Sequence, residues 1–82
     1  MEVELLYQQA LHISELTLGP ENPNLAYPLH SLAILYRELG KYKEARALYQ
    51  RALHICEQAL GPEHPLTHRI KKSHVSLQHA MD

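Results

Sequence analysis

The chain repeats itself with a period of 42 residues. When the 82-residue sequence is shifted against itself by this interval, residues 6–23 align with residues 48–65, and 13 of the 18 aligned positions are identical. Unrelated stretches of this length would share about one identity, and internal periods of roughly 20 to 50 residues are typical of stacked structural repeats. The period therefore predicts an array in which each unit buries its apolar face against its neighbours.

The repeated segment has the periodicity of an amphipathic helix. In its second copy, between positions 42 and 60, apolar residues recur at intervals of three and four, with polar residues on the opposite face. A shorter apolar stripe precedes it and ends at Gly40, where a glycine can adopt the positive φ that closes a helix. Gly61 and Pro62 end the longer helix, and Pro65 fits a first helical position because no backbone donor is needed there.

These signals predict a single all-α domain over residues 1–82. The expected helices are residues 2–18, 25–39, 41–60 and 66–81, and the short connections between them require antiparallel neighbours. Pro28 would remove a hydrogen bond from a helix that began at Pro23, so we expect a delayed start or a kink, with Asn22 as the N-cap.

The two ends of the array differ in polarity. Apolar positions become sparse between residues 66 and 82, which predicts a C-terminal capping helix with a polar outer face. The N-terminal helix copies the second helix of a repeat and lacks the first, so we expect the chain to be a segment of a longer array. Part of the cover should be missing from its apolar residues Val3, Leu6, Tyr7, Ala10 and Leu11.

Nine positions of the central repeat resemble the residue pattern of the tetratricopeptide repeat (TPR) family. The 42-residue period and the motif Leu-Gly-Pro-Glu-His-Pro at 60–65 are similar to the kinesin light chain subclass, whereas HEAT and armadillo repeats share the length but not the spacing. The resemblance implies a right-handed α-solenoid of antiparallel helix pairs, with about one and a half repeats plus the capping helix. The nine repeat-packing positions are Leu29, Leu32, Ala33, Tyr36, Gly40, Tyr42, Ala45, Tyr49 and Ala52.

Alanine at three of these positions has a physical role independent of the resemblance. Ala33, Ala45 and Ala52 are small where two helices must approach closely. The bulkier Tyr36 and Tyr49 fill the space that remains between the helices. The tyrosines are therefore expected to be core residues.

The resemblance also implies a partner-binding surface. In this family the first helices of successive repeats line a concave groove that holds a protein or peptide. The kinesin light chain subclass often carries two adjacent asparagines there, and His30 and Ser31 replace them in this chain. The implied groove residues are Tyr27, His30, Ser31, Ile34, Arg37 and Glu38, faced by Arg69, Lys72, Ser73, Ser76 and His79.

Composition and motifs exclude several other functions. Eight basic and nine acidic residues give a net charge of −1, which argues against nucleic-acid binding. No apolar run approaches the roughly 20 residues that span a bilayer, so no membrane partner and a cytoplasmic location are expected. Nucleophile motifs and phosphate-binding loops are absent, and Cys56 lies in an apolar stripe, so neither enzymatic activity nor a cofactor is predicted.

The expected function is thus a non-catalytic scaffold that binds a protein or peptide partner, and two alternatives to it remain. The first is self-assembly, a homo-oligomer formed through the uncovered N-terminal helix. The second is a metal site among the seven histidines, because imidazole is a common ligand. Pro65 separates His64 from His68 across a helix start, and the five-residue spacing of His74 and His79 is poor for one face. Surface histidines and no metal are therefore predicted.

Overall fold

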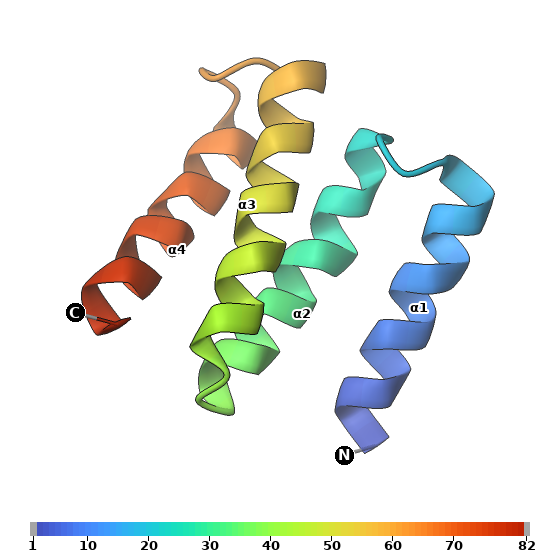
Figure 1. Cartoon of the computed structure of the whole chain (residues 1–82). Helices are drawn as coiled ribbons and strands as arrows, with labels where there is room; N and C mark the ends of the chain where they lie inside the picture. The colour runs from blue at the N-terminus through green and yellow to red at the C-terminus, as the bar shows by residue number, and fades with distance from the viewer. Residues whose placement is uncertain (1, 82) are drawn as a thin grey trace.

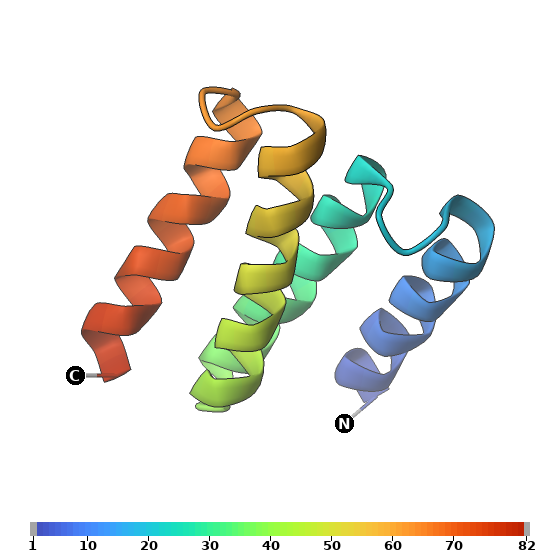
Figure 2. The same cartoon turned by 45° about the horizontal axis from the view of Figure 1, so that its top comes forward.

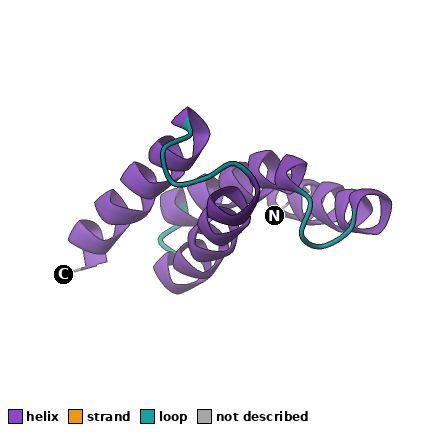
Figure 3. Cartoon of the chain, turned by 90° about the horizontal axis from the view of Figure 1, so that it is seen from above, coloured by secondary structure: helices purple, strands orange, loops and turns teal. Residues whose placement is uncertain are grey.

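The computed structural model describes residues 2–81, and no strand occurs in that range. Its elements are α1 (Glu2–Leu18), the short 3-10 helix η1 (Pro23–Leu25), α2 (Ala26–Glu38), α3 (Tyr42–Ala59) and α4 (Pro65–Met81). The all-α prediction is confirmed, and each α-helix lies within one residue of its expected bounds. The helices stand side by side with alternating direction, in a slab of 29 × 29 × 15 Å (Figures 1 and 2). When the molecule is seen from above, the loops that follow α1 and α3 lie at the end of the helices nearer the viewer (Figure 3).

Gly40 makes the sharp corner between α2 and α3. Its φ is +81°, and its amide donates to the carbonyl of Arg37 over 3.1 Å, while the amide of Lys41 donates to the carbonyl of Tyr36 over 2.8 Å. This pair of bonds is the Schellman arrangement, which satisfies carbonyls at the end of a helix and needs a residue that tolerates positive φ. The corner predicted from glycine is present.

The start of α2 is delayed, as expected from Pro28. Asn22 caps η1, because its side-chain oxygen accepts from the amide of Asn24 over 2.9 Å. The α-helix begins only at Ala26, which places Pro28 in its first turn. Amides of the first turn have no partner inside the helix, so a residue without an N–H fits there. Pro65 opens α4 for the same reason.

The core lies mainly between α2 and α3, with α4 packed on the far side of α3. Ala33, Ala45 and Ala52 are wholly inaccessible, which allows the close approach of the two central helices. Two of the nine packing positions are exposed: Tyr42 at the first residue of α3, and Gly40 in the turn before it. The core also contains Leu25, Leu29, Leu32, Tyr36, Tyr49, Ile55, Cys56, Leu66, Ile70 and Leu77.

Helix α1 is the least covered helix. Val3, Leu6, Tyr7 and Ala10 are exposed, in keeping with the missing cover expected from the sequence. Leu11 is a correction to that expectation, since it is only 8% exposed and belongs to the hydrophobic core. It lies on the side of α1 that faces α2, where cover is present.

Candidate functional site

The two helices that the resemblance assigns to the groove are joined by side-chain contacts. His30 Nε2 of α2 lies 3.2 Å from Ser73 Oγ of α4. Seven residues after His30 on α2, Arg37 Nη2 donates to Ser76 Oγ of α4 over 3.1 Å. These four implied groove residues therefore meet, and part of their hydrogen-bonding capacity is used within the chain. We call the surface around these contacts the α2–α4 face.

A hollow of about 430 Å³ opens on the α2–α4 face. Four of the implied groove residues line it, namely Ile34, Arg37, Glu38 and Ser73. The remaining lining residues are Tyr42, Tyr49 and Ala80. Sequence reasoning assigned the two tyrosines to packing alone, because periodicity places a ring in the core without showing where its hydroxyl ends.

Other implied groove residues lie outside this hollow. Tyr27, Ser31, Arg69 and Lys72 are exposed and do not line it. Tyr27 is 60% exposed at the first turn of α2. These four side chains are accessible to a partner, but the fold does not gather them with the lining of the hollow.

Tyr49 is the one fully buried side chain in the lining. Its exposed fraction is 0%, and its hydroxyl has no hydrogen-bond partner among the described residues. Its ring lies between the rings of His30 and His74, with centroid separations of 5.8 and 6.4 Å. Burial raises the pKa of Tyr49, and the nearby positive charge of Arg37 partly opposes this change. The hydroxyl therefore stays protonated near neutral pH and can donate or accept a hydrogen bond.

The two histidines beside Tyr49 are held neutral. Burial lowers the pKa of His30, and the charge of Arg69 lowers it further. Burial also lowers the pKa of His74, with Arg46 as the second cause. The Nε2 atom of His74 is buried without a partner among residues 2–81. The charge available at this face near pH 7 thus comes from arginine, lysine and glutamate side chains.

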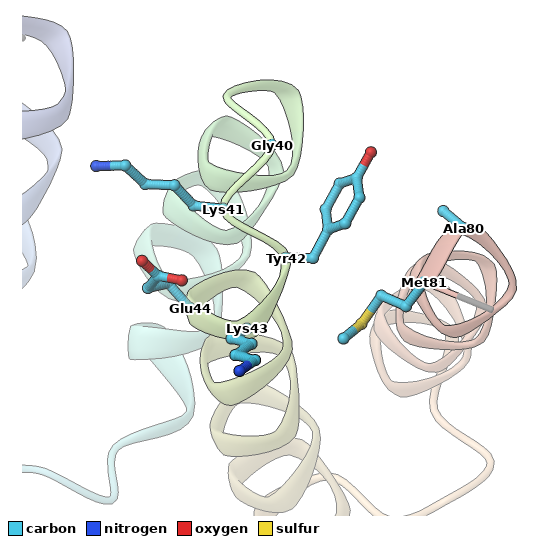
Figure 4. A pocket seen from close by; sticks show the side chains of 7 residues that line it. All are labelled: Gly40, Lys41, Tyr42, Lys43, Glu44, Ala80 and Met81. Atoms are coloured by element: carbon cyan, nitrogen blue, oxygen red, sulfur yellow. The ribbon is translucent and has the colours of Figure 1, made fainter.

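A second hollow, of about 530 Å³, lies between the start of α3 and the end of α4. Tyr42 and Met81 extend into the space between these helices, whereas Lys41 points away from it (Figure 4). Lys41 Nζ is 3.2 Å from the carboxylate of Glu4 on α1. Lys41 is therefore already paired, and Lys43 and Glu44 are the other charged side chains of this lining.

The histidines and the cysteine are engaged in structural roles or exposed. His64 Nδ1 accepts from the amide of Leu66 over 3.1 Å, at the start of α4. Within residues 2–81, no group of three or more His, Cys, Asp and Glu side chains is placed to hold a metal ion. Cys56 is buried, and burial raises the pKa of its thiol, which disfavours the reactive thiolate. In the same range, no helix has the length and apolar character needed to cross a bilayer.

The comparisons with known proteins concern the helix pair of α2 and α3. The family model described as tetratricopeptide repeat matches residues 26–66, which is half of the 82 residues. The matched model is of the kinesin light chain-like type, and it covers α2, α3 and the turn into α4. The comparison with curated proteins returned no match.

Proposed function

The chain belongs to the tetratricopeptide repeat family, and from that premise we propose that it is a non-catalytic scaffold that binds a peptide or protein segment along the α2–α4 face. Membership of the family suggests a protein–protein interaction module. The observation that supports this particular face is the hollow that Ile34, Arg37 and Glu38 line together. A partner segment seated there would meet an apolar side chain, a cation and a carboxylate side by side.

Arg37 would be the principal polar contact. Its side chain is partly exposed and uses one of its five N–H donors on Ser76, so donors remain for a carboxylate or carbonyl of the partner. Bonds from a guanidinium to an anionic acceptor are roughly twice as strong as neutral ones. The exposed Lys72 on α4 would extend the positive rim, and Glu38 would select against an acidic group placed beside it.

The experiment begins with peptides selected from a random display library against the full chain. Their affinities are then measured by fluorescence anisotropy for the wild type and for Arg37→Ala combined with Lys72→Ala. We expect the double variant to weaken binding about tenfold or more, because each charge-assisted bond contributes about 1.5 to 3 kcal/mol.

The matched control removes two other exposed cations, Lys43→Ala on α3 with Lys71→Ala on α4, which leaves the net charge equal to that of the test variant. The control should bind as the wild type does. Equal affinity for the test variant and the wild type would remove Arg37 and Lys72 from the binding site, and failure to select any peptide would count against the scaffold itself.

A further inference from the structure

Three histidines occupy contacts that hold α4 in place. Helix α4 stands at one edge of the slab and packs chiefly on α3 (Figure 1). His30 Nε2 of α2 lies 3.2 Å from the hydroxyl oxygen of Ser73 on α4. The centroid of the His74 ring on α4 lies 6.4 Å from that of Tyr49 on α3. His64, in the loop before α4, accepts a backbone amide from the first turn of that helix, so imidazoles take part in its attachment at three points.

The geometry of these contacts suits neutral imidazoles. His64 Nδ1 is an acceptor, whereas both nitrogens of a protonated imidazole are donors, so protonation at Nδ1 removes this bond. His74 Nε2 is buried, with no hydrogen-bond partner in the described range. A positive charge on the His74 ring would therefore be buried without a group to satisfy it. His30 is half-buried beneath the contact with Ser73.

Two arginines oppose a charge on His30 or His74 from across the α4 interface. Beside burial, Arg69 of α4 lowers the pKa of His30 on α2, and Arg46 of α3 lowers that of His74 on α4. In each pair α4 supplies one side chain and the neighbouring helix supplies the other. Protonation therefore sets like charges against each other across both contacts, and movement of α4 away from its neighbours relieves them. Tyr49 also faces both rings and carries no charge near neutral pH.

Helix α1 is attached by different chemistry. Two ion pairs join it to α3 and the turn before α3, Arg51 with Glu15 and Lys41 with Glu4, and neither contains a histidine. The hydrogen bond from Lys41 lowers the pKa of Glu4, so this pair persists well below pH 6.5. The alanine contact between α2 and α3 contains no titratable group. Mild acid therefore acts on the attachment of α4 and leaves these contacts in place.

We propose that mild acid releases α4 from α3 while α1, α2 and α3 stay packed. The groups that take up protons are His30, His64 and His74. Beside His64, the exposed His68 lies 3.6 Å from Glu63, and protonation of His68 favours this pair, but exposed pairs of this kind contribute little. Release separates the two helices of the α2–α4 face. Loss of a partner bound there rests on the proposed function, whereas release of α4 does not.

Hydrogen exchange with mass spectrometry tests the proposal on the full chain without any partner. Exchange rates at pH 7.5 and pH 5.5 are corrected for the intrinsic pH dependence of exchange and expressed as protection factors. Protection in α4 should fall about tenfold or more, because each histidine freed to its ordinary pKa of about 6.5 favours the released state by up to about tenfold at pH 5.5. Protection in α1 and α2 should change less than about twofold. Unchanged protection in α4, or an equal fall in all helices, would overturn the proposal.

An arginine variant tests the repulsion across the interface. Arg46→Gln with Arg69→Gln alters two exposed side chains, so the fold should persist, and protection of α4 at pH 5.5 should exceed that of the wild type about threefold. The control, Lys43→Gln with Lys72→Gln, makes the same change in net charge at exposed positions and should exchange as the wild type does. Identical protection of α4 in the arginine variant and the wild type would count decisively against the proposal.

A histidine variant tests which groups take up the protons. His30→Gln, His64→Asn and His74→Gln together put non-titrating residues at the three positions, and asparagine keeps an acceptor at the start of α4. Protection of α4 in this variant should no longer depend on pH, whereas His54→Gln, at an exposed position of α3, should behave as the wild type. A full wild-type loss of protection in the triple variant would refute the assignment. The arginine variant changes only exposed side chains and decides the question if the triple variant does not fold.

Discussion

The hydroxyl of Tyr36 on α2 accepts a hydrogen bond from the side-chain amide of Gln8 on α1. The ammonium of Lys41 lies 5.6 Å from the centre of the Tyr36 ring. Tyr49, on α3, is also buried, but its hydroxyl has no partner in the described range. Two tyrosines of the same repeat thus contribute differently to stability, one through a satisfied hydroxyl and the other despite an unsatisfied one.

Removing the two hydroxyls should affect stability differently. Tyr36→Phe should lower the free energy of unfolding by about 0.5 to 1.5 kcal/mol, because a satisfied hydrogen bond is lost. Tyr49→Phe should leave that free energy unchanged or raise it, because it removes a buried group that has no partner. Urea denaturation followed by circular dichroism measures both variants. A destabilised Tyr49→Phe would indicate that its hydroxyl is satisfied in solution.

The close approach of α2 and α3 should be sensitive to volume at position 45. Ala45→Leu places a larger side chain at a wholly buried position and should cost about 1 to 3 kcal/mol of stability. Ala47→Leu makes the same chemical change at an exposed position of the same helix and should change stability by less than about 0.5 kcal/mol. Equal urea midpoints for the two variants would contradict the close packing.

The corner at Gly40 should depend on conformational freedom and not on space. A Cβ built at this glycine meets no atom within 4 Å, so Gly40→Ala is sterically admissible. Its φ of +81° still disfavours an L residue, and we expect a loss of about 1 to 2 kcal/mol in unfolding free energy. Gly40→Asn should lose less, because asparagine tolerates the left-handed region. This account is wrong if Gly40→Asn loses more stability than Gly40→Ala, or if Gly40→Ala is as stable as the wild type.

Stability should fall as the solution is acidified below pH 6.5. Burial lowers the pKa of His30 and of His74 in the folded state, so the unfolded chain binds protons more readily than the native chain. Stability tied to neutral histidine is therefore complete above the ordinary histidine pKa of about 6.5. It is lost as the pH falls from there towards the lowered folded-state pKa values. Arg69 and Tyr49 face His30, and Arg46 and Tyr49 face His74.

Thermal melts at pH 7.5 and pH 5.5 test this dependence. The hydrogen bond from Lys41 lowers the pKa of Glu4 from its ordinary value of 4.5, so Glu4 changes stability only below that pH. Both melts are recorded above pH 4.5 and therefore do not include the titration of Glu4. His30→Gln with His74→Gln should flatten the pH dependence. His54→Gln, at an exposed position, should preserve it. An unchanged melting temperature of the wild type across this interval would exclude the proposed role of the two histidines.

Much of the fold was already determined by the order of residues along the chain. The 42-residue period, the apolar stripes, Gly40 and Pro65 predicted four helices whose bounds hold to within one residue. Asn22 and Pro28 also predicted how α2 begins. These features could be predicted because helix periodicity, capping and positive φ depend on residues that are near one another in sequence.

The tertiary structure alone decided how the candidate site is built. The contact of His30 with Ser73 joins residues 43 apart, and that of Arg37 with Ser76 joins residues 39 apart. The same packing buries the Tyr49 hydroxyl without a partner and covers Leu11 while Ile13 stays exposed. Tyr7 and Tyr49 lie in matching sequence yet differ in burial. Burial depends on which helices lie alongside a residue, and a local sequence pattern does not specify those neighbouring helices.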